Sequence, residues 1–93
     1  MENNKGFYKK LKKSLDDTTT FPAIYLYKFI IPADKEKLKS IENVFNHAGA
    51  VIDTKPSKTG KYTSISVRMN MSSSDDIIAK YEEVGKIKGV ISL

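Results

Sequence analysis

The feature that most constrains this chain is the clean two-residue alternation within residues 61–71, which predicts a β-strand with one apolar face. The apolar parity of this segment consists of Ile65, Val67, Met69 and Met71. Residues 23–31 repeat the alternation with aromatic and β-branched side chains, and Pro32 ends that segment. The parity that we assign to the buried face is Tyr25, Tyr27, Phe29 and Ile31. Two half-buried strands of this kind need a covering layer on one face of the sheet.

Two segments with apolar residues at helical intervals can supply that layer. The first helix is predicted to begin after Asp34, a suitable N-cap, and to end at Gly49. Its apolar stripe is Leu38, Ile41, Phe45 and Ala48. The second helix is predicted to be capped by Ser73 and Ser74, with two aspartates in its first turn favouring the positive end of the helix. Its stripe is Ile77 or Ile78, then Tyr81 and Val84, followed by Ile87.

Two shorter strands complete the pattern, at residues 51–55 and 90–93, and the turn formers of residues 56–60 follow the first of them. The resulting order is β-α-β-β-α-β. This order predicts an α+β, ferredoxin-like sandwich with a four-stranded antiparallel sheet and two helices on one face. We assign residues 21–93 to this single domain.

Residues 1–20 form an N-terminal extension with a different character. Phe7, Leu11 and Leu15 recur every four residues among lysines, which predicts an amphipathic helix of two to three turns. Residues 16–20 are interpreted as a polar linker, since three consecutive threonines continue a helix poorly. So short a helix is only marginally stable alone in water. We therefore keep two alternatives for it: it docks on the domain, or it frays. The stripe offers too little apolar area for a membrane surface.

Composition excludes several classes of function. The 93 residues contain no cysteine, which excludes disulfides, thiolate metal sites and thiol catalysis, and we expect a cytoplasmic protein. No secretory signal and no apolar stretch long enough to cross a membrane is visible. The formal net charge of +5 is modest and is accounted for by a soluble surface.

Catalytic and metal-binding patterns are missing from the chain. Its one histidine, His47, lies near the predicted end of the first helix and is interpreted as a partly exposed residue. Adjacent or nearby carboxylates occur at helix starts or on helix faces, where solvated charge is the usual explanation: Asp34 and Glu36, Asp75 and Asp76, and Glu82 and Glu83. No nucleotide-binding glycine motif occurs. We therefore expect no catalytic residue, no metal ligand and no cofactor, and hence no enzyme.

The most suggestive local feature is the basic segment at residues 55–62. Its lysines, hydroxyl groups and glycine-containing turn could bind an anion, with backbone N–H groups adding to the positive charge. The candidate ligand-binding residues are Lys55, Ser57, Lys58, Lys61, Tyr62 and Arg68. The alternative interpretation is an exposed hairpin loop whose lysines keep an edge strand from pairing with neighbouring molecules.

The sheet face turned away from the helices is predicted to be mixed in character. Leu26 and Ile30 lie there beside polar side chains of the strand at 61–71: Ser64, Ser66, Arg68 and Asn70. Covering by the N-terminal helix or by a second subunit would explain the apolar residues. RNA recognition motifs share this topology but stack bases on aromatic side chains of this face. Only Tyr62 is so placed here, so nucleic acid is not an expected partner.

Several short motifs resemble the YbeD-like proteins, and together they extend over residues 21–93. The motifs are Phe21-Pro22, Tyr25-x-Tyr27-Lys28, His47-Ala48, Lys55-Pro56-Ser57, Gly60-Lys61-Tyr62-x-Ser64-x-Ser66-Val67, Tyr81-Glu82-Glu83-Val84-Gly85-Lys86-Ile87 and Val90. The resemblance implies an uncharacterised bacterial cytoplasmic family with a ferredoxin-like fold similar to ACT regulatory domains. ACT domains bind small effectors near the first strand–helix turn and at subunit interfaces. Here that turn is Pro32-Ala33-Asp34, without the glycine that often permits close approach of a ligand.

These observations predict a small non-catalytic regulatory or adaptor domain that binds a protein partner or a small-molecule effector. The alternative prediction is anion or nucleic-acid binding through the basic loop at residues 55–61. A homodimer through the sheet or helix surfaces is also compatible with the pattern.

Overall fold

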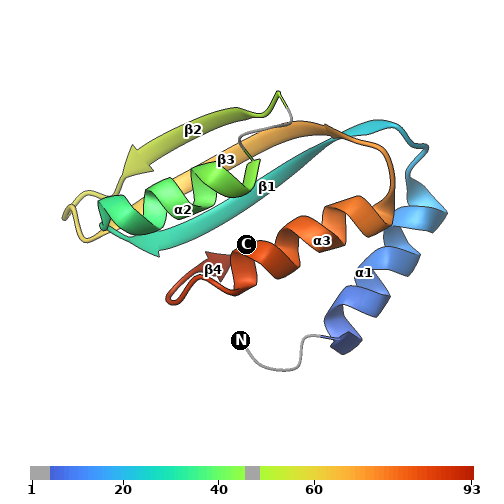
Figure 1. Ribbon diagram of the computed structural model, residues 1–93, viewed down its shortest axis with the longest axis horizontal. Helices are drawn as coiled ribbons and strands as arrows, with labels where there is room; N and C mark the ends of the chain where they lie inside the picture. The colour runs from blue at the N-terminus through green and yellow to red at the C-terminus, as the bar shows by residue number, and fades with distance from the viewer. Residues whose placement is uncertain (1–4, 46–48) are drawn as a thin grey trace.

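A computed structural model describes residues 5–45 and 49–93 and contains the predicted β-α-β-β-α-β unit, preceded by one further helix (Figure 1). The elements in chain order are α1 (Lys5–Thr18), β1 (Ala23–Pro32), α2 (Lys35–Phe45), β2 (Val51–Pro56), β3 (Tyr62–Met71), α3 (Ser74–Gly85) and β4 (Ile91–Ser92). Their ends agree with the predicted ones within a residue or two, except for those of α1 and for the end of α2, which was predicted at Gly49.

The four strands form one antiparallel sheet in the order β2-β3-β1-β4, with the two strongly alternating strands at its centre. Tyr27 of β1 lies opposite Val67 of β3, so that both apolar parities point to the same face. Helices α2 and α3 lie across that face (Figure 1). The prediction of an α+β, ferredoxin-like sandwich is confirmed.

The core fills the space between the helices and the covered face of the sheet. Tyr27, Phe29 and Ile31 of β1 have no solvent exposure, nor do Ile41, Phe45 and Ile77 of the helices. The ring of Tyr27 lies 4.9 Å from that of Tyr81 and 5.0 Å from that of Phe45, measured between centroids. Its hydroxyl donates a hydrogen bond of 3.1 Å to the carbonyl oxygen of Ile77, so the one polar atom of this ring has a partner. Burial raises the pKa of Tyr27.

Both helix starts use the predicted caps. The carboxylate of Asp34 accepts a hydrogen bond of 2.9 Å from the backbone N–H of Glu36, and the hydroxyl of Ser73 accepts one of 3.2 Å from that of Asp76. Of the two adjacent isoleucines in α3, Ile77 points into the core. Gly49 has a φ of 66°, as a glycine after a helix often has, but the predicted last turn with His47 and Ala48 lies outside the described residues.

The N-terminal helix differs from the prediction in two ways. It continues to Thr18, whose hydroxyl donates a hydrogen bond of 2.6 Å to the carbonyl oxygen of Ser14, so the predicted linker is partly helical. Its inward side chains are Tyr8, Leu11 and Leu15, whereas Phe7 remains 59% exposed. The reason is a contact between two helices: the ring of Tyr8 lies beside that of Tyr81 in α3, with centroids 6.5 Å apart. This contact turns Tyr8, rather than Phe7, toward α3.

Helix α1 is docked on α3 by a cluster of polar side chains as well as by its apolar stripe. Lys12 lies 2.9 Å from a carboxylate oxygen of Asp75 and donates a hydrogen bond of 3.2 Å to the hydroxyl of Ser74. That hydroxyl donates a hydrogen bond of 2.6 Å to Asp16. The hydrogen bond from Ser74, together with the charge of Lys12, lowers the pKa of Asp16, while the bond to Asp75 raises the pKa of Lys12. We call Lys12, Asp16, Ser74 and Asp75 the α1–α3 polar cluster.

Candidate functional site

The basic loop of residues 55–61 joins β2 to β3 as a tight turn. The backbone N–H of Ser57 donates to the carbonyl oxygen of Tyr62 at 2.8 Å, and the Ser57 hydroxyl accepts from the Tyr62 N–H at 3.1 Å. The N–H of Gly60, which has a φ of 74°, donates to the Ser57 carbonyl at 3.0 Å. Three backbone N–H donors that could have held an anion are therefore used to close the turn, whereas the Ser57 hydroxyl only accepts in it.

The charged residues predicted for the loop site are only partly brought together. Lys55, Lys58 and Lys61 are exposed at this end of the sheet. Arg68 lies opposite Leu26 and Val51, six residues along β3 from Tyr62, which is about 20 Å for an extended strand. Its neighbour is Asp53, at 3.9 Å between the guanidinium and a carboxylate oxygen. Arg68 thus belongs to the middle of the sheet and does not share a site with the loop lysines.

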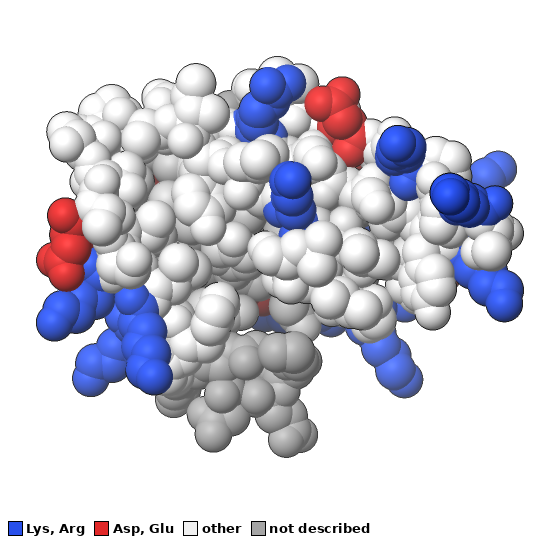
Figure 2. Space-filling view, turned by 180° about the vertical axis from the view of Figure 1, so that it is seen from behind, with Lys and Arg blue, Asp and Glu red and all other residues white. Residues whose placement is uncertain are grey.

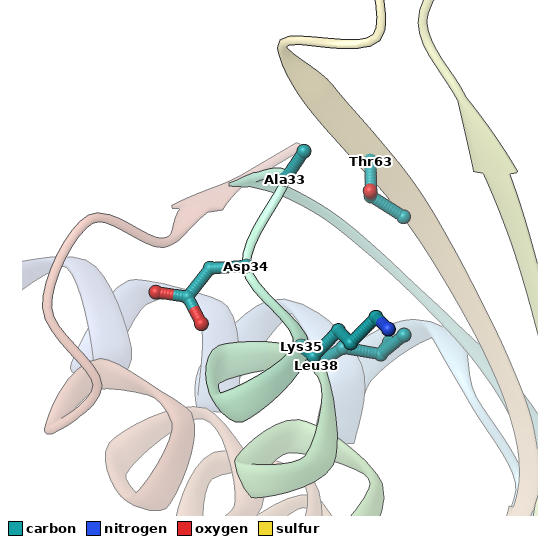
Figure 3. Close-up of a pocket in the computed structure, with 5 residues that line it drawn as sticks. All are labelled: Ala33, Asp34, Lys35, Leu38 and Thr63. Carbon is teal, nitrogen blue, oxygen red and sulfur yellow. The ribbon is translucent and has the colours of Figure 1, made fainter.

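A shallow hollow of about 230 Å³ lies at the turn between β1 and α2 (Figure 3). It is lined by Ala33, Asp34, Lys35, Leu38 and Thr63, and Figure 3 shows the Asp34 carboxylate pointing away from Thr63. The backbone N–H of Ala33 donates to the carbonyl oxygen of Lys61 at 2.9 Å, and those of Glu36 and Lys37 donate to the Asp34 carboxylate. These three amides are therefore unavailable to a small effector at this turn.

The carboxylate pairs found in the sequence are all exposed, and no three acidic or histidine side chains of residues 5–45 and 49–93 are grouped closely enough to hold a metal ion. Within the same residues, no helix is long and apolar enough to cross a membrane.

The side of the sheet turned away from α2 and α3, which we call the open face, collects most of the exposed apolar side chains. The strand register places alternate residues of all four strands on this face. Among the described residues, seven large hydrophobic side chains are exposed, and six of them belong to this face. The six are Ile24, Leu26, Val51, Tyr62, Ile91 and Leu93. The seventh is Phe7 of α1, so the apolar exposure is concentrated on one surface.

Charged side chains on the open face are mostly basic. Among the strand side chains of this face, Lys28, Lys55 and Arg68 accompany one acidic residue, Asp53. Figure 2 views the molecule from behind the sheet of Figure 1, and there blue side chains stand apart on a mainly white surface with little red. A polar row of serines and one asparagine, Ser64, Ser66 and Asn70, follows β3 and lies between the mostly apolar row of β1 and the largely charged row of β2.

The sequence predicted only part of this surface. Leu26 and Ile30 were expected on it, and Ile30 is half-buried there, opposite Ile91 of β4. The suggested cover by the N-terminal helix is wrong, because α1 packs against α3 in the helical layer. Ile24, Val51, Ile91 and Leu93 were missed. The parity of each strand was visible in the sequence, but their convergence depends on the register between strands.

Comparison with known proteins places this fold among proteins without an assigned activity. The family described as "Protein of unknown function (DUF493)" matches residues 16–93. "UPF0250 protein YbeD" of Escherichia coli O1:K1 and that of Shigella boydii serotype 18 are each 35% identical over 80 residues, covering 83% of this chain and 92% of theirs.

Two solved structures have the same fold. The uncharacterized protein TM1266 from Thermotoga maritima superimposes with a TM-score of 0.62 at 14% identity, covering 75% of this chain and 90% of its own. Protein HP0495 from H. pylori gives a TM-score of 0.64 at 21% identity, covering 82% and 86%. The motifs at residues 21–93 and the ferredoxin-like sheet agree with the sequence matches: the chain belongs to the YbeD-like family of unknown function, DUF493.

Proposed function

We propose that this protein is a small non-catalytic adaptor domain that binds a protein partner through the open face of its sheet. The observation that supports the proposal is the concentration of six of the seven exposed large hydrophobic side chains on that one face. Exposed apolar side chains that gather on one surface commonly mark interaction sites. The sequence carries no cysteine and one histidine, which supports a role without catalysis and a place in the cytoplasm.

A protein partner accounts for this face better than the other two classes of ligand considered. A small effector would need free donors at the hollow beside Ala33, where three amides are already bonded within the chain. A nucleic acid would use aromatic rings for stacking, whereas five of the six exposed apolar side chains here are aliphatic.

Anion or nucleic-acid binding through residues 55–61 remains the second proposal, supported by three exposed lysines at one end of the sheet. It predicts an affinity that falls steeply as salt is raised. Binding through aliphatic side chains of the open face would depend much less on salt.

The test is quantitative affinity capture from an extract of the producing cells, with the full chain as bait. Leu26→Lys introduces a charge on the open face, and Phe7→Lys is the matched control because Phe7 is also a large exposed hydrophobic residue but lies outside that face. We expect a set of proteins that the wild type and Phe7→Lys retain and Leu26→Lys loses, with or without nuclease. Equal capture by both variants, or loss of all captured proteins after nuclease treatment, would contradict the proposal.

A further inference from the structure

We propose that the partner surface that docks on the open face is acidic as well as apolar. The inference rests on the proposed function and names the chemistry of the partner. It starts from the position of two cations beside the apolar side chains of the face. Lys28 lies between Leu26 and Ile30 along β1, and Arg68 lies directly opposite Leu26 on β3.

The two cations are close enough to act together. Lys28 is opposite Ser66 and Leu26 is opposite Arg68, so Lys28 and Arg68 are diagonal neighbours on adjacent strands. Diagonal neighbours start roughly 7–8 Å apart, and both of these side chains are long. A carboxylate seated between them would receive charge-assisted hydrogen bonds from both, while flanking aliphatic side chains exclude water from the contact.

Neither Lys28 nor Arg68 forms a short ion pair within the described part of the chain. Lys28 has no carboxylate within 4.0 Å among those residues. The pair between Arg68 and Asp53 is long, at 3.9 Å, and both side chains are more than half exposed, at 59% and 71%. Exposed pairs of this kind add little stability, so Arg68 can exchange Asp53 for a carboxylate of another protein.

Charge and polarity also argue against other occupants of the face. A second copy, docked face to face about a two-fold axis, would set three basic side chains and one acidic side chain against the same set, which is unfavourable. A lipid surface would bury the hydroxyl and amide groups of Ser64, Ser66 and Asn70 without hydrogen-bond partners. A protein with carboxylates among apolar side chains meets both requirements.

The experiment selects ligands for the immobilised full chain from a displayed library of random 12-residue peptides. We expect enriched peptides that combine Asp or Glu with Leu, Ile, Val or Phe. A synthesised, labelled copy of an enriched peptide is then titrated with the chain and its variants. The double variant Lys28→Glu with Arg68→Glu should weaken its binding by at least about tenfold. The matched control is a double variant with two charge reversals at exposed residues of α1, Lys9→Glu with Lys13→Glu. It should bind the peptide with the affinity of the wild type.

The outcomes separate this inference from the proposed function. The enriched peptides could be apolar and contain no Asp or Glu, and their binding could be lost with Leu26→Lys but not with the Lys28/Arg68 double variant. That result would overturn the inference that the partner is acidic, but not the proposed function. Peptides that bind Leu26→Lys as well as the wild type, or no enrichment at all, would overturn both. Co-sedimentation with phosphatidylglycerol vesicles should show no binding, and vesicle binding that Leu26→Lys abolishes would replace the protein partner with a lipid surface. A concentration-dependent dimer that Leu26→Lys dissolves would replace it with a second copy.

Discussion

The two faces of the central strands β1 and β3 share the same backbone but differ in what surrounds them. On the covered face, Phe29 has no solvent exposure and is surrounded by aromatic rings and aliphatic groups of α2 and α3. On the open face, its near neighbour Leu26 is 46% exposed and has no element above it in the described chain. Alternate residues of one strand therefore differ in environment: one set stabilises the fold, and the other is largely exposed and is the surface that we propose for a partner.

The largest expected effect contrasts these parities directly. Phe29→Ala would leave a cavity in the aromatic core and should lower the free energy of unfolding by about 3–5 kcal/mol. Leu26→Ala, three residues earlier on the opposite face, should change it by about 0.5 kcal/mol or less. Urea denaturation followed by circular dichroism measures both variants, and comparable losses in the two would contradict the contrast.

Phe29→Ala could leave too little folded protein to measure, in which case Ile65→Val serves the same purpose. It removes one methylene group from the same buried layer and should cost about 0.5–1.5 kcal/mol.

A smaller effect is expected from the buried hydroxyl of Tyr27. In Tyr27→Phe the carbonyl oxygen of Ile77 loses the hydrogen bond of 3.1 Å, which should cost about 1 kcal/mol of unfolding free energy. Tyr62→Phe removes the same group from the open face, where Tyr62 is 49% exposed, and should be neutral within error. If the two variants have equal midpoints in urea, the Tyr27 hydroxyl does not stabilise the core.

The smallest effect concerns the α1–α3 polar cluster and depends on pH. The pKa of Asp16 is lowered in the folded chain, first by the hydroxyl of Ser74 and then by Lys12. Its contribution to docking is therefore complete above the ordinary aspartate pKa of about 3.9 and is lost as pH falls through the lower folded value. Amide hydrogen exchange in α1 should accelerate below about pH 4, relative to exchange in β1 of the same protein.

Asp16→Asn should abolish this acid-induced acceleration, because the amide does not titrate over this range. Asp17→Asn is the matched control, since Asp17 is exposed and forms no ion pair among the described residues. It should keep the pH dependence of the wild type. Identical profiles for all three proteins would show that Asp16 does not couple α1 to α3.

Much of the fold could be predicted from residue patterns because each element carries its own period. The two-residue alternation of 61–71 predicted which side chains of β3 are buried, and Asp34 and Ser73 predicted the helix starts. Those signals are local: they depend on φ and ψ of neighbouring residues and on which side of one element is apolar.

The candidate sites were less predictable because they depend on contacts between distant segments. The sequence favoured a loop site that included Arg68, but the register of β3 holds Arg68 beside Leu26 and away from Tyr62. Ser57 is a predicted ligand residue, and its backbone N–H and its hydroxyl oxygen both form hydrogen bonds to Tyr62 within the turn, which the sequence did not indicate. Whether these residues bind an anion stays a prediction.

The printed sequence thus determined the strands, the helices, their order and which parity of each strand is apolar, since these follow from short-range periodicity. Tertiary structure decided that α1 packs on α3 through Tyr8 rather than over the sheet, and that Ile24, Leu26, Val51 and Ile91 share one surface with Lys28 and Arg68. The physical reason is that strand register and helix docking are set by side chains far apart in the chain, whose contacts exist only once the sheet and its helical layer have assembled.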